Sequence, residues 1–166
     1  MLGRNVLVSL WLMGLLLSAT NVVAQVETRP ILTSSAAMKM IHGCLSKAQA
    51  EDWTMHIAVM DNHANLKAYH RMDDAQLISH DIALGKAQSS AGSPRSTKQW
   101  NDRAFPGGEG PTAAAFVPGL IFFEGGLPIM TADGQHIGGI GVSGDTGAND
   151  AICAQAGIDA AADDLK

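Results

Sequence analysis

The chain has 166 residues and carries 16 acidic against 11 basic residues, so its formal net charge at pH 7 is −5. This length suits one globular domain with a buried core. No basic cluster is visible, which argues against nucleic acid as a partner, because duplex binding depends on Lys and Arg contacts to phosphate.

The first 24 residues have the layout of a secretory signal peptide. Arg4 supplies a positive charge, residues 6–17 form an apolar run, and Val22 and Ala24 are small residues before a cleavage site. A retained membrane anchor is the alternative, but the run is short for a span, which needs about 20 residues. We expect cleavage after Ala24, which also removes Arg4, and a periplasmic or secreted protein of net negative charge.

The next segment reads as an extended lead-in over residues 25–33, followed by a helix. Pro30 disfavours an earlier helix start. Apolar residues then recur at spacings of three and four and predict a helix over about 35–51, with His42 at the edge of its apolar face. The apolar positions are Ala37, Met40, Ile41, Cys44, Leu45 and Ala48.

Alternating residues over 53–61 and 65–72 predict two strands that form a hairpin around the turn at 62–64. A second helix is expected to begin at Asp73 and Asp74 and to end before Pro94. Its predicted buried side holds Leu77, Ile78, Ile82 and Ala83. Residues 96–116 are rich in Gly and Pro, and we expect a long irregular loop of the kind that often has a function.

The last part of the chain predicts three short strands, over 120–123, 127–131 and 136–143. A final helix capped by Asp145 or Thr146 is expected to continue to about residue 163, with Ile152, Cys153, Ala156 and Ala160 inward. The order is α-β-β-α-β-β-β-α. It predicts an α/β (α+β) fold in which helices cover a five-stranded antiparallel sheet, as one domain over residues 34–166.

Residues 139–144 match the pattern G-x-G-x-x-G of dinucleotide-binding proteins. That pattern needs a turn between a strand and a helix within a β-α-β unit. Here the first two glycines, Gly139 and Gly141, fall inside a predicted strand. We therefore interpret them as positions where another backbone or a ligand approaches closely.

Several segments together resemble the GlcG/HbpS-like family, whose members are described as haem-binding or haem-degrading. The resemblance covers roughly residues 34–162, and it rests mainly on Gly125-Gly126-Leu127-Pro128-Ile129 and on residues 138–144. It implies a three-layer, profilin-like fold, homodimers or larger homo-oligomers, and haem as a cofactor in several members. Two segments depart from the family pattern: the turn at 62–64 lacks glycine, and residues 101–116 are longer than expected.

The resemblance also implies site residues. A haem iron needs an axial ligand such as imidazole, and the family's ligand is a histidine on the first helix, where His42 is the one histidine present. Lys86, Gly125 and Gly126 complete the expected cofactor-binding set. Lys86 would bind an anion such as a carboxylate or a haem propionate, or else pair with Asp61 or Asp81 for a structural purpose.

The remaining candidate residues give weaker evidence for a catalytic or metal-binding site. His56 and His70 lie on neighbouring strands and can pair across the hairpin as a metal or haem site, but the pattern favours positions that face solvent. A Ser143–His136–Asp145 triad lacks a nucleophile elbow, and no zinc spacing is present. Cys44 and Cys153 are either bonded in an oxidising compartment or two buried thiols.

Three functions remain open from the sequence. The first is an exported protein that binds haem through His42 for storage, scavenging or sensing. The second is an enzyme or binding protein for a small carboxylate, which would use Lys86, Asp61 and the loop 101–116. The third is a dimeric scaffold without a small ligand. No convincing catalytic constellation decides whether the protein is an enzyme.

Overall fold

The computed structural model describes residues 27–107 and 110–166. The predicted signal peptide, residues 1–24, lies outside this part. Residues 27–33 have no regular structure, as the lead-in prediction implies, yet Leu32 is buried in the core. Among the described residues, no helix is both long and apolar enough to cross a membrane.

The sheet consists of two antiparallel hairpins joined side by side. In the first, β1 (His56–Asp61) pairs with β2 (Leu66–Arg71), and in the second, β3 (Gly126–Met130) pairs with β4 (His136–Ser143). β1 also pairs antiparallel with β4, so the strand order is β2-β1-β4-β3. β1 and β4 are therefore central, and β2 and β3 are edges.

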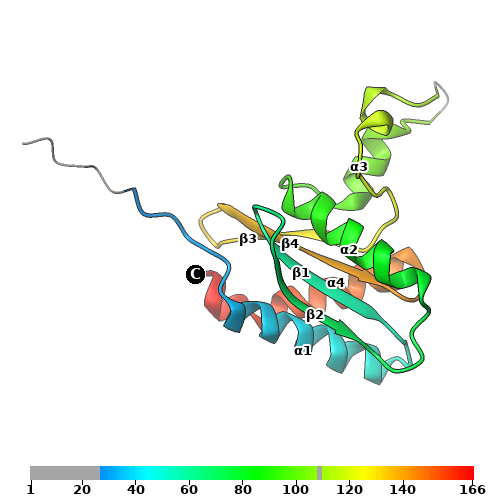
Figure 1. Ribbon diagram of the computed structural model, residues 1–166. Helices are drawn as coiled ribbons and strands as arrows, with labels where there is room; N and C mark the ends of the chain where they lie inside the picture. The colour runs from blue at the N-terminus through cyan, green and yellow to red at the C-terminus, as the bar shows by residue number, and fades with distance from the viewer. Residues whose placement is uncertain (1–26, 108–109) are drawn as a thin grey trace, which may run out of the picture.

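Helices cover both faces of this sheet and give three layers (Figure 1). α1 (Ser34–Ala50) and α4 (Gly147–Ala160) pack on each other and on one face, while α2 (Ile78–Ala91) lies across the other. The hydroxyls of Thr33 and Thr146 cap α1 and α4 by accepting from backbone amides. The larger core lies between the sheet and the α1–α4 pair and includes Met40, Ile41, Ile57, Val59, Ile129, Ile140 and Val142.

α2 lies close to the sheet because small residues face each other across this layer. Ala83, Ala87 and Ala91 are buried on α2, and Gly139 and Gly141 lie opposite on β4. A Cβ on either glycine would overlap the α2 backbone. This confirms the interpretation of the glycines as points of close backbone approach, and the approaching backbone is α2.

The sheet has four strands in the part of the chain that the structure describes, so the prediction of five is wrong. Residues 120–123 form no strand. Ile121 packs instead on α2, where its backbone N–H donates to Ser89 Oγ at 2.9 Å and its side chain occupies the space that Gly85 leaves free. An apolar run of four residues does not specify whether it will pair as a strand in the sheet or pack on a helix.

Two further predictions of local structure are corrected. The segment 96–116 is not an irregular loop, because it contains α3 (Thr97–Ala104) and a 3₁₀ helix, η1 (Ala113–Phe116). Ser96 and Gln99 form a capping box that starts α3. Leu77 and Ile78, expected on the buried side of the second helix, are 83% and 68% exposed because α2 begins only at Ile78 and the sheet lies under its later turns.

Cys44 on α1 and Cys153 on α4 form a disulfide, with Cα atoms 4.7 Å apart. Both residues are fully buried where the two helices pack. The bridge joins residues 109 positions apart in the chain. The structure therefore decides between a disulfide and two buried thiols in favour of the disulfide.

A short 3₁₀ helix, η2 (Ala162–Leu165), follows α4.

Candidate functional site

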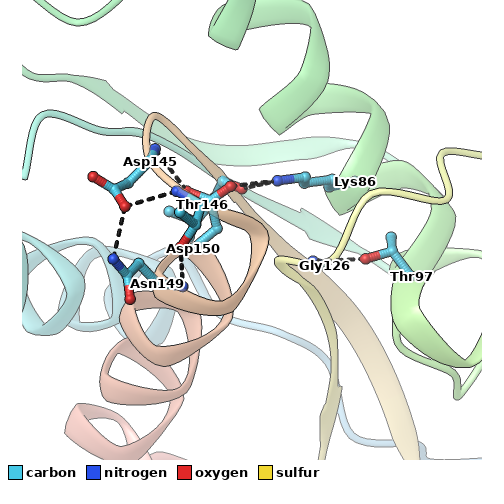
Figure 2. A network of polar contacts seen from close by, with 8 residues as sticks. Lys86, Thr97, Gly126, Asp145, Thr146, Asn149 and Asp150 are labelled. Atoms are coloured by element: carbon cyan, nitrogen blue, oxygen red, sulfur yellow. Dashed lines mark hydrogen bonds and ion pairs between the residues drawn. The ribbon is translucent and has the colours of Figure 1, made fainter.

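The chemically distinctive feature of the described residues is a buried ion pair between α2 and the start of α4. Lys86 and Asp150 are 1% and 2% exposed, and Lys86 Nζ lies 2.7 Å from Asp150 Oδ2. Nζ also donates to the Val142 carbonyl at 2.8 Å. Figure 2 shows the lysine reaching from α2 to the carboxylate. The Asp145 backbone N–H donates to the second carboxylate oxygen at 3.2 Å.

Gly125 and Gly126 belong to the same cluster because they pass between the ion pair and α3. Gly125 has φ +120°, a conformation that favours glycine, and a Cβ there would lie 2.8 Å from Lys86 Nζ. The Gly126 N–H donates to Thr97 Oγ1 at 3.0 Å (Figure 2). The structure therefore brings together three of the four residues expected to bind a cofactor, and it separates them from His42.

Burial acts on both partners of the ion pair. It lowers the pKa of Lys86 and raises the pKa of Asp150, and their mutual attraction opposes both changes without reversing them. The pair is thus closer than usual to the neutral form, in which the amine is unprotonated and the carboxyl carries the proton. Such a pair can hold or move one proton between Lys86 Nζ and Asp150 Oδ2.

A cavity of about 280 Å³ opens beside this pair. Its walls come from α2, from the segment before β3, from the end of β4 and from the first turn of α4. The lining residues are Ile82, Lys86, Phe123, Glu124, Ser143, Asp145, Gly147 and Asp150, and we call it the Lys86 pocket. Lys86 already pairs with Asp150. It therefore does not neutralise the other two acidic residues, Glu124 and Asp145, and the pocket is acidic. This disfavours the interpretation of Lys86 as a binding residue for a carboxylate or a propionate.

Asp61 does not take part in this cluster. Its side chain closes the turn after β1, where Oδ1 accepts from the backbone N–H groups of His63 and Asn65 at 2.9 and 3.0 Å. These hydrogen bonds, among others, lower the pKa of Asp61 against the opposing effect of burial, which is the largest single influence on it. Neither Asp61 nor Asp81 is the partner of Lys86.

His42 lies on the outer side of α1 and is exposed. It lines a shallow depression of about 320 Å³ together with Lys39, Gly43, Ser46 and Ala160. Within the described part of the chain its ring makes no hydrogen bond, so both nitrogens are free for a ligand. His70 is similar in this respect and lines a separate depression beside Leu45 and Arg71.

The other histidines on the strands are engaged. His56, which is 1% exposed, lies under α2, where Nε2 contacts the Gln76 carbonyl at 2.9 Å and Nδ1 contacts Tyr69 OH at 2.5 Å. Tyr69 OH also lies 2.7 Å from His80 Nδ1. His56 is opposite Arg71 rather than His70. The hypothesis of a shared His56–His70 site is wrong, because alternation along the hairpin places the two side chains on different faces of the sheet.

The structure also excludes a catalytic triad of Ser143, His136 and Asp145. Ser143 and His136 occupy opposite ends of β4, which are about 23 Å apart at the rise of a strand. His136 Nε2 instead lies 2.9 Å from the Ser90 carbonyl.

Sequence reasoning missed Glu124 and Ser143 as pocket residues and the Tyr69–His80 contact. These residues come from separate elements and share no local pattern, so only the packing of α2 against the sheet brings them together. Lys86 is among the residues singled out from the sequence, but its pairing with Asp150 spans 64 positions in the chain and has no local signal.

Comparison with known proteins gives consistent matches. A family model described as "Haem degrading protein HbpS-like" matches residues 32–159. Protein GlcG of Escherichia coli strain K12 is 39% identical over 117 residues, which cover 70% of this chain and 84% of GlcG.

Two solved structures share the fold. Protein ORFY of Klebsiella pneumoniae superposes with a TM-score of 0.74 at 29% identity, over 84% of this chain and 97% of ORFY. A structure of PduOC in complex with haem superposes with a TM-score of 0.71 at 26% identity, over 79% of this chain and 95% of PduOC.

Proposed function

The chain belongs to the HbpS-like family, and we propose that it is an exported protein that stores, scavenges or senses haem, in which His42 would hold the haem iron. The observation that carries this proposal is the free, exposed imidazole of His42 on α1, in a chain whose fold matches that of a protein solved in complex with haem. Of the described histidines, His56, His63, His80 and His136 have a ring nitrogen engaged by another protein group.

The residues around His42 fit haem as one wall of a site. Haem iron accepts an imidazole nitrogen, and His42 offers one without breaking an internal hydrogen bond. Lys39, in the same depression, is 48% exposed and pairs with Asp164 at 2.7 Å, so a propionate would replace that carboxylate as its partner. When bound, haem would supply an iron centre with a Soret absorption band.

One protomer provides only a shallow surface at His42, whereas a haem site normally excludes water. We therefore propose that a second copy of the chain covers the opposite face of the haem. In this arrangement α1 provides the ligand, and the packing of Gly43 against Ala156, Gly157 and Ala160 holds α1 on α4.

Export is part of the same proposal. It is supported by the signal-like pattern of residues 1–24 and by the Cys44–Cys153 disulfide, since such bonds persist mainly outside the reducing cytosol. If the leader is removed as proposed, mass spectrometry of the exported protein will give a chain that starts at Gln25.

A haem titration followed by absorption spectroscopy tests the binding proposal. We expect a saturable Soret shift at micromolar haem, and we expect His42→Ala to weaken binding by more than about tenfold, since loss of a ligand costs at least as much as loss of its supporting contacts. His63→Ala is the matched control, because His63 is also exposed but lies on the turn after β1.

Each other result has a definite meaning. Unchanged haem affinity in His42→Ala would refute the ligand assignment, and His70→Ala would then be the next variant to titrate. The absence of any saturable shift would refute haem binding itself and leave a scaffold or a protein for another ligand. Light scattering with and without haem checks whether a second copy closes the site.

A further inference from the structure

We propose that the Lys86 pocket binds a small, uncharged aldehyde or ketone and holds it reversibly as an imine on Lys86 Nζ. This activity is independent of haem binding, because the Lys86 pocket and the His42 depression have no lining residue in common.

The first argument is the placement of the amine. Lys86 is almost fully buried, and its Nζ is held by Val142 O at 2.8 Å and Asp150 Oδ2 at 2.7 Å. These two contacts use two of the three N–H positions of the ammonium group, and the third position has no hydrogen-bond acceptor among the described residues. An amine held in this way is oriented before a ligand arrives, which is what nucleophilic attack requires.

The second argument is the space around the nitrogen. Gly125 passes directly beside Nζ, and a Cβ at that position would lie 2.8 Å from Nζ and 2.6 Å from Asp150 Cβ. With φ +120° this residue has a conformation that side chains rarely adopt. No side chain therefore projects from Gly125 over the amine, and Lys86 is one of the residues that line a cavity of about 280 Å³.

The third argument concerns the proton transfer that imine formation requires. Lys86 Nζ lies 2.7 Å from Asp150 Oδ2, so a proton can pass from Nζ to the carboxylate and leave an unprotonated amine. Burial lowers the pKa of Lys86 and raises the pKa of Asp150, and both changes favour this transfer. Nζ adds to the carbonyl carbon and forms a carbinolamine. The Asp150 carboxyl then protonates the departing hydroxyl, water leaves, and the proton remaining on nitrogen returns to Asp150. The balance is one amine and one carbonyl compound to one imine and one water.

The lining of the pocket defines the ligand class. Glu124 and Asp145 make the entrance acidic, which disfavours ligands that carry a carboxylate or a phosphate. Ser143, which is 5% exposed, offers a hydroxyl to the same space. A hydroxyaldehyde of a few carbon atoms has the size, the neutral charge and the hydrogen-bonding groups that match these walls.

Reductive trapping tests the proposal. The full chain is incubated with glyceraldehyde and cyanoborohydride, and peptide mass mapping then locates the stable secondary amine. We expect Lys86 to be labelled faster than exposed lysines such as Lys98, because burial lowers the pKa of Lys86 and so raises the fraction of the amine that is unprotonated. Glyceraldehyde 3-phosphate, with the same carbonyl group and added negative charge, should label Lys86 much more slowly.

Lys86→Arg is the matched variant, because a guanidinium keeps a cation beside Asp150 but forms no imine under these conditions. It should lose the label at position 86 and keep the slow labelling of surface lysines. Labelling of Lys86 no faster than that of Lys98 would overturn the proposal, and the pair would then be purely structural. Equal labelling by both aldehydes would overturn the proposed selectivity. Mapping of the wild-type chain decides the main question even if Lys86→Arg does not fold.

Discussion

At the scale of single residues, His56 shows how packing changes the chemistry of a side chain. The alternation of β1 leaves open which face meets solvent, and α2 buries the face that carries His56. Because Nε2 donates to the Gln76 carbonyl, Nδ1 is left to accept from Tyr69 OH, which is the pattern of a neutral imidazole. Burial is the main reason that the pKa of His56 lies below its usual value of 6.5.

This lowered pKa predicts a dependence of stability on pH. Between 6.5 and the lower pKa of the folded state, the unfolded chain binds more protons at His56 than the folded chain does. The free energy of unfolding should therefore fall as the pH is lowered through this window. We expect His56→Gln to show a smaller fall than the wild type in urea unfolding between about pH 7.5 and pH 5.

His42→Gln serves as the control for this comparison, since His42 is exposed and makes no hydrogen bond within the described residues. It should retain the full wild-type fall. If His56→Gln retained it too, another group would be responsible and His56 would not be the residue that senses pH.

At the scale of elements, α2 and β4 pack closely because the residues that face each other have very small side chains or none. Gly139 and Gly141 face Ala83, Ala87 and Ala91, so the helix backbone rests almost directly on the strand. This close layer positions Lys86, on the same helix, to reach Asp150 across the end of β4. The Lys86 pocket thus depends on glycines that do not line it.

We expect Gly141→Ala to lower the free energy of unfolding by about 1–3 kcal/mol, because a methyl group there would overlap the α2 backbone and force the helix outward. Urea unfolding measures this change. Gly92→Ala is the control: Gly92 has φ −76°, and its Cβ would meet Gln88 O at an ordinary 3.4 Å. Equal stability of the two variants would mean that α2 is free to shift on the sheet.

At the scale of the whole molecule, the Cys44–Cys153 disulfide ties the first helix to the last across a separation of 109 residues. Together with the α1–α4 packing it closes the core on one face of the sheet. A crosslink over so long a segment restricts the unfolded chain strongly, and its loss from a small domain typically costs about 2–5 kcal/mol.

The double variant Cys44→Ala, Cys153→Ala should lose about 2–5 kcal/mol of unfolding free energy in urea. Adding a reductant should bring the wild type to a similar midpoint and leave the double variant unchanged. A wild type that is insensitive to reduction under unfolding conditions would show that the two cysteines are not bonded in the purified protein.

The sequence by itself determined the elements whose residues follow a regular period over several turns or pairs. The helix predicted over 35–51 is α1 at Ser34–Ala50, and the strand predicted over 136–143 is β4 with the same bounds. The family resemblance was likewise readable from contiguous motifs, and the match over residues 32–159 confirms it. These features depend on neighbours in the chain, which a sequence displays directly.

Only the tertiary structure decided what depends on distant contacts. Residues 120–123 form no strand and Ile121 packs on α2, since an isolated apolar run is satisfied by either arrangement. Lys86 meets Asp150 rather than Asp61 because α2 crosses the sheet toward the start of α4. The disulfide required two helix faces to meet. In each case the contact joins elements far apart in the chain, for which the sequence carries no local pattern.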